Sequence, residues 1–447
     1  MLWWLSVALS GSLQGYHAAY LSTPGLVFSP RSGGFAGDLN HDGVSEVWMG
    51  ARRALIGGWD GGGMELYLGS SARVSTPWAW FVGDGRNANL GAGVAFGDVN
   101  GDGEIDVLVG QSGRLPGNPW YVMEPARLHV WFGPIRQQMY LASSSDRVIE
   151  SVEICDGDFG PLVPDVTGDG LPDIIITRSN RDGLPSQVLV VDLGRASRPG
   201  PRVRPLEPAI WGSFEGDSPG DMQREVQLVG DLDQDGLPEV AWEHAGSLGW
   251  QRWVVEGRAL GAGGVVAVAD VGRGLAEAGP INPAGDVDRD GVPDIIITSK
   301  AFYAGARIVG GRDVMAIAPG QVARESDYGD LLEVGYFGVV SEAIGIGDVN
   351  GDGFDDWALG EVNETPGLWF VPPEGPGSVW IGLGDGTIRR TTGKRAAVGE
   401  AFTSPVLAPG AVAPWLAVGQ DCDGDQLPDL LVPAEVAVGS QWAMLCY

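Results

Sequence analysis

The sequence predicts an all-β protein, specifically a seven-bladed β-propeller, and three observations lead to this fold class. A nine-residue acidic loop recurs seven times along a chain of 447 residues. Short apolar runs flank each copy, and glycine and proline bound these runs as they bound strands in other β proteins. The first aspartates of successive copies are 60, 67, 66, 55, 62 and 73 residues apart, which indicates a repeat architecture.

Each repeat is expected to contain about four short strands. The first strand ends at the first aspartate of the loop, the second follows the loop directly, as at 106–110, and a third comes farther on, as at 128–133. A four-stranded sheet with mixed faces cannot bury itself alone, but a ring of such sheets can. Seven repeats therefore predict seven blades around one axis.

The two ends of the chain are expected to close the ring. The last repeat supplies strands near 415–418, 430–432 and 442–447, and then the chain ends. The segment 20–28 precedes the first loop and could provide the missing fourth strand. Such pairing would remove two exposed sheet edges.

Residues 16–447 are predicted to form one propeller domain, and residues 1–15 are a candidate signal peptide. The start is apolar, and Ala8, Leu9 and Ser10 resemble a small-residue cleavage site. No basic residue precedes this stretch and it is short, so a buried first strand or a truncated start stays open as an alternative. We expect export, with a secreted or cell-surface location.

Composition limits the partners. The chain has 28 basic and 58 acidic residues and a formal charge of −30. This balance opposes binding to nucleic acids or anionic membranes and favours a cation. No apolar run reaches the roughly 18 residues that a membrane helix needs.

The three cysteines do not form a disulfide framework. Cys422 lies in the last loop and Cys446 in the last strand, so the two could be bridged in an oxidising compartment. Two separate buried thiols are the alternative, and Cys155 stays free in either case.

The acidic loops have the pattern D-x-[D/N/T]-x-D-x-x-x-[D/E], and they are predicted to bind Ca²⁺. Carboxylates on alternate residues repel one another, and no lysine or arginine occupies the opposing ligand positions. Oxygen ligands on a flexible loop suit Ca²⁺ better than Mg²⁺. Positions 1, 3, 5 and 9 would supply side-chain oxygens and position 7 a backbone carbonyl, while glycine at position 6 allows the sharp turn.

The candidate ligands at positions 1, 3, 5, 7 and 9 are, loop by loop, Asp38, Asn40, Asp42, Val44 and Glu46; Asp98, Asn100, Asp102, Glu104 and Asp106; Asp165, Thr167, Asp169, Leu171 and Asp173; Asp231, Asp233, Asp235, Leu237 and Glu239; Asp286, Asp288, Asp290, Val292 and Asp294; Asp348, Asn350, Asp352, Phe354 and Asp356; and Asp421, Asp423, Asp425, Leu427 and Asp429.

Up to seven ions are expected, and the sites should differ in strength. The Asp231 and Asp286 loops each carry four carboxylates, whereas Thr167 should weaken the Asp165 loop. The Asp421 loop has Gln426 where glycine is expected and Gly424 two residues earlier. The alternative is that some loops are Asx turns held by hydrogen bonds without metal. Because each ion would bind inside one blade, we expect it to stiffen the structure.

The repeats resemble the FG-GAP repeats of the integrin α-subunit propeller and of related bacterial extracellular proteins, over about residues 20–447. The acidic loop followed by a strand is the most specific feature, and the segments 90–97 and 335–340 resemble the family's Phe-Gly strand. Most second strands lack a following Gly-Ala-Pro, and Arg-Gly-Asp does not occur. The resemblance implies that the loops join the first two strands of each blade and that the protein is an adhesion-type module.

No sequence motif indicates an enzyme. The four histidines lack metal-ligand spacing, and His41 at position 4 of its loop should point outward. Aromatic residues are expected in the connections between second and third strands, where they suit a protein or glycan ligand. These residues are Trp59, Trp120, Tyr121, Trp250, Phe302, Tyr303, Trp369 and Phe370. Their alternative role is to pack loops onto the blades.

The expected function is that of a calcium-binding extracellular propeller that binds a protein or glycan without catalysis. The alternatives are a calcium-dependent propeller enzyme, such as a polysaccharide lyase, and a purely structural surface protein.

Overall fold

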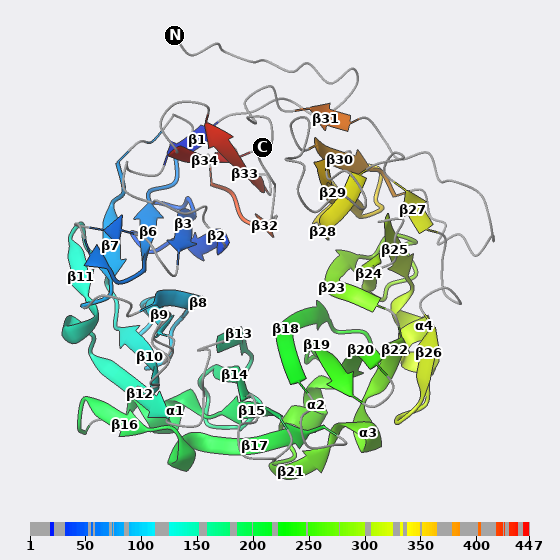
Figure 1. The fold of residues 1–447 in the computed structure, drawn as a ribbon, viewed down its shortest axis with the longest axis horizontal. Helices are drawn as coiled ribbons and strands as arrows, with labels where there is room; N and C mark the ends of the chain where they lie inside the picture. The colour runs from blue at the N-terminus through cyan, green and yellow to red at the C-terminus, as the bar shows by residue number, and fades with distance from the viewer. Residues whose placement is uncertain are drawn as a thin grey trace, which may run out of the picture.

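The chain is all-β, and in the computed structural model its sheets stand around a central axis like the blades of a propeller (Figure 1). The structure describes residues 18–21, 32–51, 55–56, 59–70, 74, 76–84, 89–111, 125–151, 159–178, 186–198, 200–216, 222–246, 249–276, 278–299, 305–324, 331–333, 338–348, 351–363, 378–384, 401–403, 417–422, 424, 429–436 and 441–446.

Seven sheets of four or five strands are arranged around this axis. The first holds β2 (Ser32–Gly37), β3 (Glu46–Ala51), β6 (Gly63–Tyr67), β7 (Ala79–Val82) and β11 (Met139–Leu141). The second holds β8 (Leu90–Gly97), β9 (Asp106–Gln111), β10 (Ala126–Trp131), β12 (Arg147–Ser151) and β16 (Val203–Pro205). The third holds β13 (Phe159–Val163), β14 (Asp173–Arg178), β15 (Gln187–Val191), β17 (Ile210–Glu215) and β21 (Gly264–Ala267).

The fourth sheet holds β18 (Met222–Gly230), β19 (Glu239–Gly246), β20 (Gly249–Val255), β22 (Arg273–Ala276) and β26 (Val322–Arg324). The fifth holds β23 (Ala278–Gly285), β24 (Asp294–Ser299), β25 (Gly305–Val309) and β27 (Leu331–Glu333). The sixth holds β28 (Gly338–Gly347), β29 (Asp356–Asn363), β30 (Ser378–Gly382) and β31 (Ala401–Thr403). The seventh holds β32 (Ala417–Val418), β33 (Leu430–Val436), β34 (Gln441–Cys446) and β1 (Ala18–Leu21).

The remaining elements are short and lie in connections. They are the two-stranded sheet of β4 (Leu55–Ile56) and β5 (Trp59–Asp60), the helices α1 (Leu193–Ser197), α2 (Gly257–Leu260), α3 (Val268–Val271) and α4 (Gly311–Ala316), and the 3-10 turns η1 (Ala142–Ser144) and η2 (Glu207–Ala209). In the part of the chain that the structure describes, none of the helices has the length and apolar character needed to cross a membrane.

The ends of the chain meet in the seventh sheet. The N-terminal strand β1 pairs antiparallel with β34, with Ala18 opposite Cys446 and Leu21 opposite Ala443. The innermost strands β32, β2, β8, β13, β18, β23 and β28 contact one another in this order, and β28 contacts β32 in turn. The predicted donor segment 20–28 thus overlaps β1 at Tyr20 and Leu21, and its remaining residues lie outside the described part.

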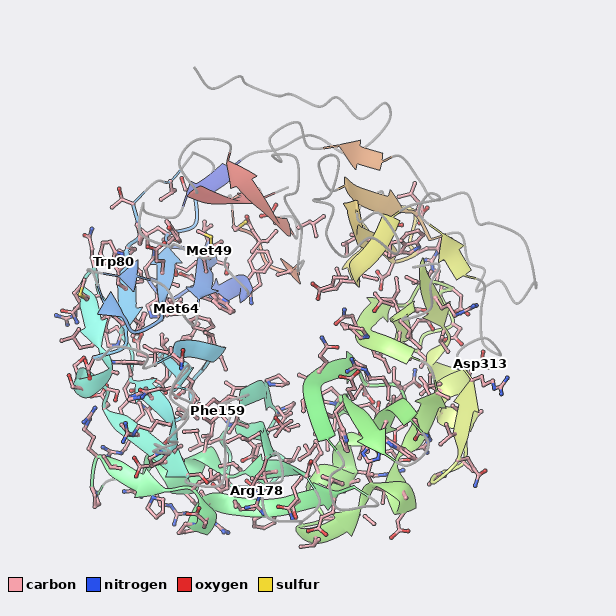
Figure 2. All side chains as sticks on the ribbon, in the orientation of Figure 1. Met49, Met64, Trp80, Phe159, Arg178 and Asp313 are labelled. Carbon is pink, nitrogen blue, oxygen red and sulfur yellow. The ribbon has the colours of Figure 1, made fainter. Side chains whose placement is uncertain are left out.

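Apolar side chains fill the spaces between neighbouring sheets (Figure 2). In β14, Ile174 and Ile176 pack against the second sheet, whereas Ile175 packs against the fourth. Successive residues of a strand point to opposite faces, so a strand between two sheets must be apolar on both. This explains the continuous apolar runs that follow the acidic loops.

A fifth, parallel strand on the first four sheets was not predicted. The strands β11, β16, β21 and β26 each come from the connection between the third and fourth strands of the following sheet. Each pairs parallel with the outermost strand of the preceding sheet, as Gly274 does with Val322. Neighbouring sheets are therefore joined along their outer edges as well as through their cores.

The structure describes two of the predicted partner-binding aromatic residues. Trp59 lies in β5, between the second and third strands of its sheet, as expected. Trp250 instead lies within the third strand β20, because β19 and β20 form a tight hairpin in which Gly246 pairs with Gly249. Trp120, Tyr121, Phe302, Tyr303, Trp369 and Phe370 lie outside the described residues.

Candidate metal centres

Each acidic loop joins the first two strands of one sheet, which is the placement that the repeats predict. The seven loops connect β2 to β3, β8 to β9, β13 to β14, β18 to β19, β23 to β24, β28 to β29 and β32 to β33. Of the predicted ligands, Asn350, Asp423, Asp425 and Leu427 lie outside the described residues. The other thirty-one are described, so six loops can be compared in detail.

The aspartate at position 1 organises the turn by accepting backbone hydrogen bonds. In the second loop, Asp98 Oδ1 accepts from the backbone nitrogens of Gly101 at 2.6 Å and Asp102 at 3.2 Å, and Asp98 Oδ2 accepts from Gly103 at 2.8 Å. The bond from position 6 to position 1 recurs at Asp38, Asp165, Asp231, Asp286 and Asp348. These bonds have the geometry of Asx turns and leave carboxylate lone pairs for a cation.

Positions 5 and 7 are linked in the same way in every loop where both are described. The backbone nitrogen of position 7 donates to the first carboxylate oxygen of position 5, at 2.9 to 3.1 Å. The donors are Val44, Glu104, Leu171, Leu237, Val292 and Phe354. Metal ligation by the carbonyl oxygens of these residues stays a prediction.

The carboxylate at position 9 is buried and fastens three strands of its sheet together. Asp294 Oδ2 accepts from the backbone nitrogen of Val287 at 3.0 Å, and Asp294 Oδ1 accepts from Gly311 at 3.1 Å. Val287 follows the first strand, Asp294 begins the second and Gly311 follows the third. Asp106 accepts the same pair of hydrogen bonds, from the backbone nitrogens of Val99 and Gly133.

Burial changes the protonation of these position-9 carboxylates. It raises the pKa of Glu46, Glu239 and Asp294 to about 7 and the pKa of Asp106 and Asp173 to about 6, and their backbone hydrogen bonds only partly oppose it. A nearby divalent cation would favour the ionised form and lower these pKa values. Cation binding should therefore release protons near neutral pH.

The fourth and fifth loops present the tightest groups of carboxylates among the described residues. One oxygen each of Asp231, Asp233 and Asp235 lies within 4.8 Å of the others, and the same holds for Asp286, Asp288 and Asp294. Ca²⁺ binds oxygen at 2.3–2.6 Å, so oxygens this close to one another can share one ion. These are the two loops that the sequence singles out for their four carboxylates.

In the first and second loops, an amide occupies position 3. Asn40 Nδ2 donates to Asp42 Oδ2 and to Glu46 Oε1, both at 3.0 Å, and Asn100 Nδ2 donates to Asp102 Oδ2 at 2.9 Å. The amide nitrogen thus neutralises part of the carboxylate repulsion, as a metal would. To coordinate an ion through oxygen, these amides would have to rotate.

The third loop differs from the others at position 3, whereas the described part of the seventh loop resembles them at position 4. Thr167 Oγ1 donates to Asp173 Oδ1 at 3.2 Å, so the hydroxyl is a partner of position 9. In the seventh loop Gly424 has φ of +89° and donates to Asp421 Oδ1 at 2.6 Å, as Gly101 and Gly168 do at position 4 of their loops. Gly424 is therefore an ordinary position-4 residue and not a displaced position-6 glycine.

The ligand positions hold no lysine or arginine, but in two loops an arginine from elsewhere in the sheet reaches a carboxylate. Arg312 Nε lies 3.0 Å from Asp290 Oδ2, and Arg258 Nη2 lies 3.6 Å from Asp233 Oδ2. Both arginines follow the third strand of their sheet, in α4 and α2. The loop sequence cannot reveal them, because they reach the loop only once the third strand has paired.

Comparison with known proteins finds similarity to a curated protein over part of the chain. No family model matches the chain. Integrin alpha-PS2 of Drosophila melanogaster is 30% identical over 163 residues, which is 33% of this chain and 11% of that protein. The chain thus spans about a tenth of the length of this relative, and the match is too short to show membership of a family.

The chain is distantly similar to several solved structures. BBS1N in complex with ARL6DN is 8% identical with a TM-score of 0.49, covering 95% of this chain and 93% of that chain. The Dos1 propeller is 10% identical with a TM-score of 0.44, covering 90% and 74%. Rhamnogalacturonan lyase YesW is 12% identical with a TM-score of 0.41, covering 92% and 71%.

Proposed function

We propose that the protein is a closed, seven-bladed β-propeller that is stabilised by Ca²⁺ and binds a partner outside the cell without catalysis. The carboxylate groups in the fourth and fifth loops carry this proposal, because their oxygens are close enough to share an ion. The ring of contacts among the innermost strands and the pairing of β1 with β34 support closure. An ion at the root of each blade would join the three strands that position 9 already connects.

Export is supported by the last loop. Cys422 is disulfide-bonded, and disulfides persist mainly in oxidising compartments. Cys422 is fully buried between the seventh and first sheets, beside Val47 and Leu431. A covalent bond at this place would strengthen the junction of the chain ends.

A protein partner is supported by the outer rim. Five of the six large apolar residues that are exposed among the described residues lie on the outer parallel strands: Met139, Leu141, Val203, Val265 and Val322, with exposed fractions of 37 to 68%. Strand edges with exposed apolar side chains invite pairing or packing. The aromatic residues Trp59, Trp120, Tyr121, Trp369 and Phe370 stay proposed contacts.

A non-catalytic role is supported by the burial of two of the four histidines. His129 and His244 are buried, with 4% and 1% of their surface exposed, and burial lowers the pKa of His129 to about 4. Neither histidine can meet a substrate without opening a blade. A propeller enzyme such as a polysaccharide lyase is the alternative, and a cluster of His, Lys or Arg in the central pocket would favour it.

The decisive experiment is calorimetric melting of the protein in EGTA and in millimolar CaCl₂, alone and with Asp233→Asn and Asp288→Asn together. We expect Ca²⁺ to raise the Tm of the unaltered protein, because a ligand that binds only the native state stabilises it. The double variant should lose much of this increase. A Tm that does not respond to chelation would refute structural calcium, and a screen of immobilised proteins and glycans would then test the binding role separately.

A further inference from the structure

Position 4 of the acidic loops has an unusual backbone. Its φ is positive in every loop, at 63° for His41, 62° for Gln234 and 59° for Arg289. Glycine occupies this position in the other four loops, as Gly101, Gly168, Gly351 and Gly424. A left-handed conformation costs a non-glycine residue on the order of 1 kcal/mol. Three loops therefore carry a side chain where glycine would be less strained.

Each of these three side chains reaches the next loop around the ring. His41 Nε2 lies 2.9 Å from Glu104 Oε2, at position 7 of the second loop. Gln234 Nε2 donates to the carbonyl oxygen of Gly291, at position 6 of the fifth loop. Two of the three position-4 side chains thus contact the following loop through a hydrogen bond. The third, Arg289, contacts an aromatic side chain of the following loop.

The third contact is a cation–π pair. The guanidinium carbon of Arg289 lies 5.7 Å from the ring centroid of Phe354, at position 7 of the sixth loop. The same guanidinium lies over Gly353, where an added Cβ would be 2.7 Å from Arg289 Nη1. Arg289 thus covers positions 6 and 7 of the next loop together.

The residue at position 7 matches its neighbour at position 4 in six of the seven loops. Glu104 and Phe354 follow loops with His41 and Arg289, and loops that follow a glycine have an aliphatic residue at position 7. The exception is Val292, which is aliphatic although it follows the loop with Gln234, and Gln234 bonds the backbone of position 6 instead. Leu171 packs on Gly101, so that a Cβ there would lie 3.2 Å from Leu171 Cδ2, and Val44 lies similarly beside Gly424. This matching within one chain indicates that the contact between loops is specific.

We propose that the position-4 side chains are positioning residues for the metal site of the following loop: His41 for the Asp98 loop, Gln234 for the Asp286 loop and Arg289 for the Asp348 loop. This inference rests on the proposed calcium binding. Positions 6 and 7 contain the turn and the carbonyl expected to bind the ion, so a bond to them holds the ligand in place before the ion arrives. Holding a site in its bound shape raises its affinity.

The calcium affinities of the loops should therefore differ in a way that the number of ligands in each loop does not predict. The second, fifth and sixth loops are braced by polar side chains, whereas each of the other four follows a loop with glycine at position 4. Gln234 provides the clearest case, since an uncharged amide changes the shape of the next loop without adding charge to it.

Two reciprocal variants test this inference by isothermal titration of the whole protein with Ca²⁺. Gln234→Gly removes the brace on the fifth loop and introduces the residue that four loops already use, so the native backbone should form. Gly168→Gln introduces a side chain of the same reach beside the fourth loop. We expect Gln234→Gly to weaken one site roughly three- to tenfold with unchanged stoichiometry. We expect Gly168→Gln to strengthen one site.

A background variant locates the effect. In Asp288→Asn, which weakens the fifth loop itself, adding Gln234→Gly should cause little further change. The inference is overturned if Ca²⁺ binds but Gln234→Gly leaves the isotherm unchanged, or if its effect persists fully in Asp288→Asn. A protein that binds no Ca²⁺ at all would refute the proposed function, and this inference with it.

Discussion

The backbone nitrogen of Gly311 donates to Asp294 Oδ1 over 3.1 Å, and this bond ties the end of the third strand to the start of the second. The other oxygen of Asp294 holds the first strand through Val287. Because Asp294 is only 1% exposed, water cannot replace either bond. The loop is therefore part of the blade's own hydrogen bonding, with or without an ion.

The substitution Asp294→Asn should destabilise the protein even when calcium is removed. The amide nitrogen would face a backbone N–H, so one buried donor loses its partner, at a cost of about 1–3 kcal/mol. Denaturant unfolding in EGTA measures this change. Asp288→Asn is the matched control, because it keeps the acceptor for Asp290 and removes a like charge. Equal losses in the two variants would contradict the structural role of position 9.

The calcium-free protein should become less stable as the pH rises from about 4 to 7. Burial raises the pKa of Glu46 and Glu239 from 4.5 to about 7, so the native state holds protons that the unfolded state has released. Stability is then complete below the unfolded pKa and is lost as the pH rises through the native pKa. Each such carboxylate lowers the free energy of unfolding by on the order of 3 kcal/mol above pH 7.

Denaturant unfolding in EGTA at several pH values measures this loss, and the same series in Ca²⁺ is the control. Bound calcium should flatten the dependence, because the ion stabilises the ionised carboxylates. A stability in EGTA that rises between pH 4 and 7 would contradict the assignment of these carboxyls as buried and protonated.

The sequence predicts those parts of the fold that depend on the spacing of neighbouring residues within one repeat. The run at Ile174, Ile175 and Ile176 identifies a strand covered on both faces, and Asp165 eight residues before Asp173 marks the loop. These features depend on local spacing alone. The sequence alone therefore predicts the order of loops and strands and the interval between repeats.

Features that depend on pairing between repeats could not be read in this way. The strand β16 has only three residues, too few for a pattern to identify, and it pairs with the edge of β12. The contact of Arg312 with Asp290 requires the third strand to return beside the loop. The positive φ of His41 was equally hidden, because glycine marks this position in only four of the loops.

Arg312→Gln should increase the calcium affinity of the fifth loop. The guanidinium of Arg312 lies against Asp290 and competes with an ion for its charge, so its removal should strengthen binding by roughly a few-fold. The pair is largely exposed, so calcium-free stability should fall by less than about 1 kcal/mol. Titration calorimetry measures the affinity, and Arg324→Gln on β26 controls for net charge. Affinity that is equal in both variants would exclude Arg312 as a competitor.

Removal of β1 should open the ring at the seventh sheet. A chain that starts at residue 22 lacks the partner of β34, whereas a chain that starts at residue 18 keeps all four pairs from Ala18 to Leu21. We expect the shorter chain to have a lower Tm, because its third strand becomes an exposed edge. It should also associate at high concentration, and calorimetry with light scattering measures both effects. If the two truncated chains have the same Tm, β1 does not stabilise the seventh sheet. If only the shorter chain has a lower Tm, the pairing of residues 18–21 with β34 joins the two ends of the chain.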